Sequence, residues 1–203
     1  MEFIAHRVNK KESLLELDPK FGVEIDLRDD LTGKIYLEHD PFTAGQDFEE
    51  YLKNYEHGTM ILNVKSERVE LKALELLEKY KISNYFFLDS SFPMIHLLSK
   101  MGVKNSALRF SEFEGLDTIK TMKKKVDWVW VDCFTKFPLT MEVSAELKSL
   151  GYKICIVSPE LQGQPEKIGK YAEKILKEKI QVDAICTKVF NVEVWEKCLS
   201  IDL

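Results

Sequence analysis

The chain has 203 residues, of which 45% are hydrophobic and 31% are charged, and its formal net charge at pH 7 is −5. This length supports one well-packed core, and the composition excludes bulk disorder. The acidic balance argues against a general binding surface for nucleic acids or anionic membranes, while a local basic pocket stays open.

Short β-rich runs alternate with helical stretches along the chain. Strands are predicted at Glu2–Val8, Val23–Arg28, Met60–Lys65, Tyr85–Asp89, Ser106–Phe110, Trp128–Cys133, Lys153–Val157 and Ala184–Val189. Helices are predicted at Phe48–Tyr55, Ser66–Tyr80, Pro93–Lys100, Asp117–Lys124, Met141–Leu150, Glu166–Lys179 and Val192–Leu199, the second of them capped by Ser66. The segment Ile35–His39 follows a turn signal and predicts either a hairpin or an extension of the second strand.

This alternation determines the expected fold. Strands separated by helices indicate βαβ units and a parallel sheet, and eight such units match a small (β/α)₈ TIM barrel. An open doubly wound sheet is the alternative, but no Gly-x-Gly-x-x-Gly or Walker loop follows any predicted strand. No linker rich in Pro, Gly or Ser divides the chain, so we expect a single domain over residues 1–203.

The expected location is a reducing cytoplasm. The four cysteines have no C-x-x-C spacing, and Cys133, Cys155 and Cys186 lie in apolar strand-like runs, which is typical of reduced, buried thiols rather than disulfides or a metal site. The apolar runs are far shorter than the roughly 18 residues of a membrane span, and the N-terminus does not read as a secretory signal.

Chemically useful side chains gather where the first two predicted strands and the hairpin segment end. In a barrel, catalytic groups come from the carboxyl ends of strands and the loops that follow them. His6 and Arg7 end the first strand, Glu24 and Asp26 share one face of the second because they are two residues apart, and His39 ends the hairpin segment. On the third strand, Asn63 and Lys65 again share a face.

These residue types suit the cleavage of a phosphodiester. Glu24 and Asp26 offer the hard oxygen ligands that Mg²⁺ or Ca²⁺ prefers. Histidine side chains have an unperturbed pKa near neutrality, which suits His6 and His39 to act as a general base and a general acid. Each residue taken singly also has a structural explanation, such as a solvated histidine or an ion pair. The combination of two histidines with a carboxylate pair favours the catalytic interpretation.

Three segments together resemble the glycerophosphodiester phosphodiesterase family, a PLC-like phosphodiesterase barrel. They are Ile4–Asn9, Val23–Leu27 and Leu37–Pro41, which match the family's His-Arg, Glu-x-Asp and His-Asp pattern. Phe87–Phe92 and Val182–Thr187 are similar to its fourth-strand and closing segments. Asn9, and Asn63-x-Lys65 where an Asp-x-Lys would stand, resemble the related sphingomyelinase-D-type phospholipases.

The resemblance implies specific roles and also shows departures. It implies that His6 and His39 are the acid–base pair, that Glu24 and Asp26 bind the metal, and that a substrate hydroxyl attacks phosphorus to give a cyclic phosphate. Arg7 and Lys65 would hold phosphate oxygens.

The family's third metal carboxylate is here the neutral Asn63, its Glu-Asn-Thr segment is missing, with only Glu12 nearby, and its insertion after the second strand is short. The preferred substrate is therefore not carried over from the family. Asp132, on the sixth strand, is a candidate for the charge that Asn63 lacks, with structural pairing as the alternative. Arg109, Glu112 and Glu160 also stand at strand ends.

We therefore expect a metal-dependent phosphodiesterase, either a hydrolase or a cyclising lyase, acting on a small glycerophosphodiester-like substrate with Mg²⁺ or Ca²⁺. Its expected partner is that small molecule, with no nucleic acid and no membrane span. Two alternatives remain. One is a degenerate barrel that binds a phosphorylated ligand without turnover, and the other is a different barrel enzyme, such as an isomerase, using Asp26 and Lys65.

Overall fold

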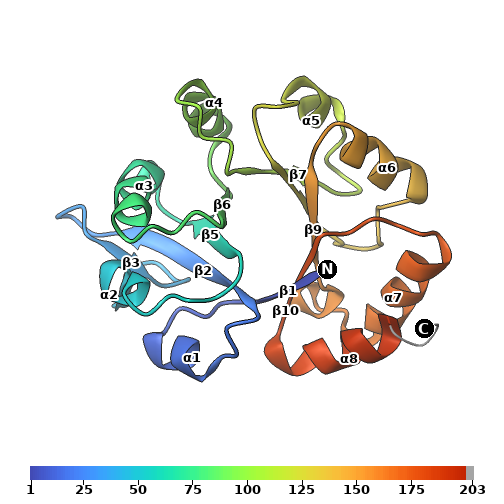
Figure 1. Cartoon of the computed structure of the whole chain (residues 1–203), viewed down its shortest axis with the longest axis horizontal. Helices are drawn as coiled ribbons and strands as arrows, with labels where there is room; N and C mark the ends of the chain where they lie inside the picture. Colours follow the sequence, from blue (N-terminus) through green and yellow to red (C-terminus); the bar gives the residue numbers. More distant parts are fainter. Residues whose placement is uncertain (200–203) are drawn as a thin grey trace. The chain divides into compact units, whose positions relative to one another are not determined.

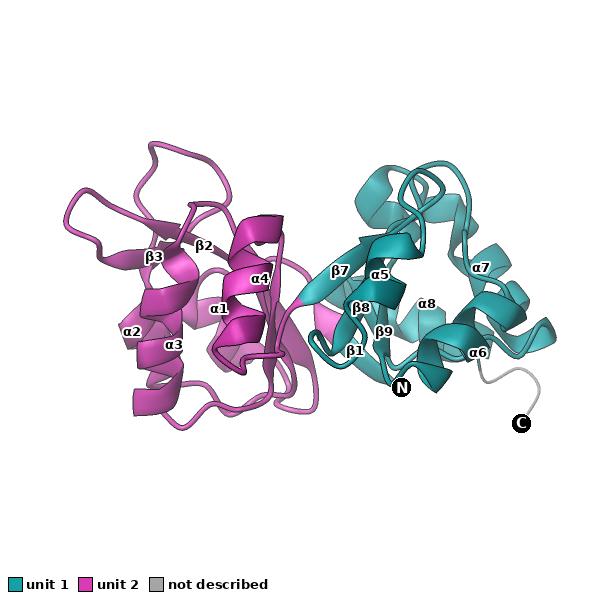
Figure 2. Ribbon diagram, turned by 90° about the horizontal axis from the view of Figure 1, so that it is seen from above, with its two compact units in different colours: residues 1–3, 107–203 teal, residues 4–106 magenta. Residues whose placement is uncertain are grey.

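Strands and helices alternate through residues 1–199, the part of the chain that this computed structural model describes (Figure 1). The chain divides into two compact units, drawn in different colours in Figure 2. We call residues 4–106 the N-terminal unit, and residues 1–3 together with the chain from residue 107 onwards the C-terminal unit. The single domain over residues 1–203 stays a prediction.

The N-terminal unit is built on parallel strands with an antiparallel hairpin beside them. Strands β2 (Gly22–Asp29), β5 (Met60–Val64) and β6 (Tyr85–Leu88) pair in that order, and the end of β1 (Glu2–Ala5) pairs with β2. Strand β3 (Ile35–Leu37) runs antiparallel to β2, and β4 (Gln46–Asp47) antiparallel to β3. The predicted hairpin is thus confirmed, and the alternative of an extended second strand is wrong.

Helices follow the strands of this unit. They are α1 (Lys11–Glu16), α2 (Phe48–Leu52), α3 (Val69–Lys79) and α4 (Phe92–Lys100). Ile25, Leu27 and Phe48 belong to the apolar core and are fully buried. Residues 22–27 of β2 are all buried, as expected for a parallel strand covered on both faces. The polar side chains within residues 22–27, Glu24 and Asp26, therefore lie in a low-dielectric environment.

The C-terminal unit repeats the same alternation. Its parallel strands pair in chain order: β7 (Ala107–Phe110), β8 (Trp128–Val131), β9 (Lys153–Val157) and β10 (Ala184–Thr187). The helices are α5 (Asp117–Thr121), α6 (Met141–Ser149), α7 (Ile168–Lys177) and α8 (Val189–Leu199), with 3₁₀ turns at Pro159–Gln162 and Pro165–Lys167. The predicted strand and helix order is confirmed, and the differences are at the ends of elements: β10 stops at Thr187 rather than Val189, and α8 begins at Val189 rather than Val192.

Two local predictions are wrong. Ser66 does not cap α3: the residue before the helix is Arg68, in a left-handed conformation (φ 70°), and Ser66 Oγ instead accepts a hydrogen bond from the Asp29 N–H at 3.2 Å. The first strand ends at Ala5 rather than Val8, because Arg7 is also left-handed (φ 57°) and turns the chain.

Two general expectations can be compared with the described residues. Cys133, Cys155 and Cys186 are buried free thiols and Cys198 is a half-buried one, as the sequence predicts. None of the helices within residues 1–199 is both long enough and apolar enough to span a bilayer.

Candidate active site

The candidate site lies where strands β1, β2 and β5 of the N-terminal unit carry polar side chains. The parallel register brings Asp26 of β2 directly opposite Asn63 of β5. His6 follows β1, and Lys65 follows β5. Because parallel strands present their carboxyl ends at one edge, residues distant in the sequence meet here.

Glu24 is the most strongly perturbed carboxyl of the site. Its side chain is 1% exposed, and it accepts hydrogen bonds of 2.8 Å from the Arg7 N–H and from Asn63 Nδ2. His6 Nε2 lies 3.8 Å from Glu24 Oε2. Burial, and then the negative charge of Asp26, raise the pKa of Glu24 to about 7. A carboxyl with this pKa exchanges a proton near neutral pH.

Asp26 is held by an amide and an ammonium group. Asn9 Nδ2 donates to Asp26 Oδ2 at 2.8 Å, and Asn9 Oδ1 accepts from the Asp26 N–H at the same distance. Lys65 Nζ lies 3.7 Å from Asp26 Oδ1 and 3.8 Å from Asp89 Oδ2. Lys65 therefore supplies positive charge beside the buried carboxylates.

The left-handed backbone at Arg7 directs a main-chain donor into the site. For a residue with a Cβ, such a conformation costs of order 1–3 kcal/mol. At φ 57° the Arg7 N–H reaches Glu24, and the next residue, Val8, donates its N–H to the Glu24 carbonyl oxygen at 2.9 Å. The Arg7 side chain is exposed. The strained residue thus holds the His6 loop against β2.

His39 lies on the loop between β3 and β4, at the edge of a pocket of about 880 Å³ that Arg7, Asn9 and Glu38 also line. Its Nδ1 is 2.8 Å from Asp40 Oδ1. A hydrogen bond from Nδ1 to this carboxylate fixes the tautomer and leaves Nε2 for proton transfer. The hydrogen bond from His39 lowers the pKa of Asp40, which keeps that carboxylate ionised.

Arg28 connects the His39 loop to the end of β5. Its guanidinium donates to three carbonyl oxygens: Glu38 at 3.2 Å, His39 at 2.7 Å and Lys65 at 3.3 Å. These bonds hold the backbone of one predicted catalytic residue beside that of the predicted phosphate-binding lysine. Arg28 is not among the site residues predicted from the sequence, although its place two residues after Asp26, on the same face of β2, is an available signal.

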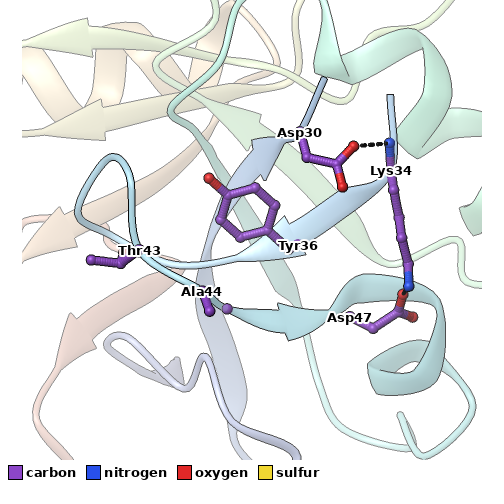
Figure 3. A pocket seen from close by; sticks show the side chains of 7 residues that line it. Asp30, Lys34, Tyr36, Thr43, Ala44 and Asp47 are labelled. Atoms are coloured by element: carbon purple, nitrogen blue, oxygen red, sulfur yellow. Dashed lines mark hydrogen bonds and ion pairs between the residues drawn. The ribbon is translucent and has the colours of Figure 1, made fainter. Parts of the chain in front are cut away.

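The base of this loop requires a glycine. A Cβ on Gly45 would lie 2.4 Å from the Leu37 carbonyl oxygen and 2.6 Å from Tyr36 Cδ2. On the other side of the loop lies a second pocket of about 310 Å³, where Lys34 Nζ pairs with Asp47 at 2.7 Å (Figure 3). This ion pair links Lys34, directly before β3, to Asp47 in β4, the two strands that flank the His39 loop.

The structure brings together five of the seven predicted site residues. Contacts link His6, Glu24, Asp26, Asn63 and Lys65, whereas the side chains of Arg7 and His39 line the adjoining pocket. Asp89, after β6, joins the cluster through Lys65 and is a further residue that sequence analysis does not assign. The available signal is its place as the last residue of the predicted strand Tyr85–Asp89.

The donor set suits a hard divalent cation. Asp26 Oδ1 and Asn63 Oδ1 are buried oxygens without a hydrogen-bond partner among the described residues. Together with Glu24 they offer two carboxylates and an amide oxygen, the ligand types that Mg²⁺ and Ca²⁺ prefer. No group of three or more His, Cys, Asp or Glu side chains in residues 1–199 is placed to hold a metal ion. A cation held by Glu24, Asp26 and Asn63 would take its remaining ligands from water or substrate.

Asp132, in the C-terminal unit, has partners of its own. Its carboxylate accepts hydrogen bonds from Arg109 Nη1, from Trp130 Nε1 at 3.1 Å and from Gln162 Nε2 at 3.0 Å. Burial is the largest effect on this carboxyl and raises its pKa. Three donors account for a buried carboxylate, so these contacts favour the structural alternative over a substitute for the charge that Asn63 lacks.

The other strand-end carboxylates also have local partners. Glu160 accepts from Thr187 Oγ1 at 2.6 Å and from the Lys188 N–H at 3.1 Å. Glu112 accepts from the N–H and the Oγ1 of Thr135, at 2.6 and 2.7 Å. Both carboxylates hold loops of the C-terminal unit in place.

Comparisons with known proteins identify the fold. No family model and no curated protein matches the chain. Among solved structures, it is similar to a phosphodiesterase of Oleispira antarctica in complex with the product sn-glycerol-3-phosphate, with 13% identity, a TM-score of 0.69, and 98% of this chain and 96% of that chain covered. It is also similar to a glycerophosphodiester phosphodiesterase of Agrobacterium tumefaciens, with 13% identity, a TM-score of 0.67, and 98% and 99% covered.

These similarities extend over nearly the whole chain, and at such low identity they establish the fold alone. The predicted fold class and the resemblance are confirmed at this level: the chain has the (β/α)₈ TIM-barrel fold of the glycerophosphodiester phosphodiesterases.

Proposed function

We propose that the chain is a metal-dependent phosphodiesterase that acts on a small glycerophosphodiester-like substrate. The observation that carries this proposal is the cluster of His6, Glu24, Asp26 and Lys65 at the strand ends of a fold shared with phosphodiesterases. The sn-glycerol-3-phosphate in the similar Oleispira structure supports a small glycerol phosphate as one part of the substrate.

His6 and His39 are the proposed acid–base pair. One imidazole accepts the proton of the attacking substrate hydroxyl, and the other donates a proton to the departing alcohol oxygen, so the two proton transfers balance. The Asp40 carboxylate at His39 Nδ1 supports Nε2 as the transferring atom. Glu24, 3.8 Å from His6 Nε2, stabilises the protonated form of that imidazole when the carboxyl is ionised.

Lys65 and Arg7 are the proposed contacts for the non-bridging phosphate oxygens. The Lys65 side chain is 19% exposed, which keeps its ammonium accessible while Asp26 and Asp89 orient it. The Arg7 side chain is exposed at the pocket that contains His39. A guanidinium and an ammonium group are the side chains best suited to phosphate.

Glu24, Asp26 and Asn63 are the residues that would hold Mg²⁺ or Ca²⁺. Asp26 Oδ1 and Asn63 Oδ1, the two buried oxygens of the site that have no hydrogen-bond partner among the described residues, support this assignment. When bound, the cation neutralises charge on a phosphoryl oxygen. The raised pKa of Glu24 adds a condition, because a proton competes with the cation for this carboxylate below neutral pH.

Binding without turnover is the second candidate. It is favoured by the internal partners of the two carboxylates, since Asn63 Nδ2 already donates to Glu24 and Lys65 already lies beside Asp26. Because the two carboxylates already have partners within the protein, the site can hold a phosphorylated ligand without a cation.

The decisive experiment is phosphorus-31 NMR of glycerophosphodiesters incubated with the full chain, with Mg²⁺ or with EDTA. We expect loss of the diester signal with Mg²⁺ and appearance of a cyclic phosphate or a phosphate monoester. Calorimetry with the same compounds distinguishes the second candidate, which requires binding without product. If the chain neither binds nor cleaves these compounds, both proposed functions are refuted.

A further inference from the structure

A pocket lined by lysines lies in the C-terminal unit, between the loop after β8 and helix α7. Its volume is about 290 Å³. Four of its lining residues are Lys136, from the loop, and Lys167, Lys170 and Lys174, from the start and body of the helix. This concentration of positive charge contrasts with the net charge of −5 of the whole chain.

The helix presents these lysines on one face. Positions 167, 170 and 174 are spaced by three and four residues, which places them one above another along a helix. Like charges at this spacing repel, and lysines near a helix N-terminus also oppose the helix dipole. The first turn of α7 has no acidic residue to offset them. The arrangement is unfavourable for the helix by itself and favourable for a bound anion.

The lysines are mostly not neutralised by ion pairs. Lys167 Nζ donates to the Thr135 carbonyl oxygen at 3.2 Å and to Gln164 Oε1, both uncharged acceptors. Lys174 Nζ lies 3.4 Å from the Phe137 carbonyl oxygen and 4.0 Å from Glu178 Oε2. For the described residues, this ion pair with Glu178 is the one salt bridge found for the four lysines.

The other acidic groups nearby do not cancel the remaining charge. Lys136 and Lys170 are exposed and have no carboxylate within ion-pair distance among residues 1–199. Glu112 and Glu166 are the carboxylates whose charges act on Tyr171 in the pocket wall. With Glu178 they make three carboxylates, against the four lysines of the pocket. With four lysines close together, the pocket keeps a positive potential.

Two aromatic residues form the apolar part of the lining. Phe137 and Tyr171 are buried, with ring centroids 5.0 Å apart, and Lys174 Nζ lies 5.5 Å from the Phe137 ring centroid. The Tyr171 hydroxyl is buried and has no hydrogen-bond partner among the described residues. Burial raises the pKa of Tyr171 to about 12, so the hydroxyl keeps its proton as a donor at neutral pH.

We propose that this lysine pocket binds a small phosphorylated anion, at residues entirely different from those of the candidate active site. The ammonium groups of Lys136 and Lys170 would contact phosphate oxygens, while Lys167 and Lys174, already held by carbonyl oxygens, form the positive wall. The volume of about 290 Å³ is just below the roughly 300–1,000 Å³ of small-ligand sites. It suits a phosphate group with a small organic part. This proposal does not depend on the phosphodiesterase activity.

Calorimetry of the full chain with two probes, inorganic phosphate and sn-glycerol-3-phosphate, tests the proposal in EDTA. The salt is set at physiological ionic strength, so that charges beyond roughly 8 Å are screened. We expect the double variant Lys136→Gln/Lys170→Gln to weaken binding by about tenfold or more, which corresponds to about 1.4 kcal/mol. Lys123→Gln, which removes another exposed lysine, is the control, and Lys65→Gln leaves this site intact while altering the candidate active site.

The outcomes separate clearly. The proposal is supported if the double variant loses one binding event that Lys65→Gln retains. Tighter binding of sn-glycerol-3-phosphate than of inorganic phosphate assigns a phosphate monoester as the ligand, and equal binding assigns the phosphate group alone. Binding unchanged in the double variant, or lowered equally by Lys123→Gln, overturns the proposal. No binding of either probe to the wild-type chain overturns it as well.

Discussion

The buried carboxyl of Glu24 makes stability depend on pH, and Glu24→Gln isolates this effect. A rise of its pKa from 4.5 to about 7 corresponds to about 3 kcal/mol. Between these two pH values the folded chain binds a proton that the unfolded chain has released, so the free energy of unfolding decreases as pH increases. The contribution is fully present below the unfolded pKa of 4.5 and is lost as pH rises through about 7.

Glutamine has nearly the same shape and carries no charge at any of these pH values. It can accept from the Arg7 N–H and, after a turn of the Asn63 amide, donate to Asn63 Oδ1, which has no partner among the described residues. We therefore expect the variant to gain stability relative to wild type on going from about pH 5 to about pH 8, by up to about 3 kcal/mol. The substitution removes first the cost of burying a charged carboxylate at position 24, and then its repulsion with Asp26.

Urea denaturation at several pH values in EDTA measures this difference directly. Asp18→Asn removes an exposed carboxyl whose pKa is lowered chiefly by a hydrogen bond from the Lys20 N–H. Its free energy of unfolding is expected to run parallel to that of wild type above about pH 5. If the free energies of unfolding of Glu24→Gln and wild type changed in parallel with pH, the raised pKa of Glu24 would be refuted. Added Mg²⁺ should then stabilise wild type most at the high-pH end, where Glu24 is ionised, and stabilise the variant less.

Three further predictions follow from the site. His6→Ala and His39→Ala are each expected to lower turnover by roughly 10²–10⁴-fold, with the exposed His96→Ala as a control; near wild-type rates would exclude the acid–base assignment. Arg28→Met removes the donor to three loop carbonyl oxygens and is expected to cost about 2 kcal/mol of stability and to lower kcat more than it changes KM; wild-type values of both would show that the loop does not need it. Asn63→Asp is expected to tighten Mg²⁺ and Ca²⁺ binding in a calorimetric titration, because the amide oxygen has no net charge; unchanged affinity would mean that Asn63 is not a ligand.

Local patterns were sufficient for much of the fold and part of the site. The period of two along β2 places Glu24 and Asp26 on one face, whatever lies opposite them. The alternation of apolar runs with amphipathic stretches gives the order of strands and helices, because each element needs one buried face. These patterns do not predict helix α1, because it has only six residues and Lys10 provides no side-chain cap. The role of Ser66 was misread because the Asp29 N–H that it binds lies 37 residues away in the sequence.

The remaining contacts of the site depend on pairing between strands that are far apart in the sequence. The register of β2 against β5 puts Asn63 beside Asp26, and only this packing allows Asn63 Nδ2 to reach Glu24 and Lys65 to lie between Asp26 and Asp89. The same holds for the lysine pocket, where Lys136 meets a helix face that begins some thirty residues later. Such contacts depend on which strands and loops become neighbours. Hydrophobic periodicity reports which face of an element is buried, and it contains no information about which side chain lies across from it.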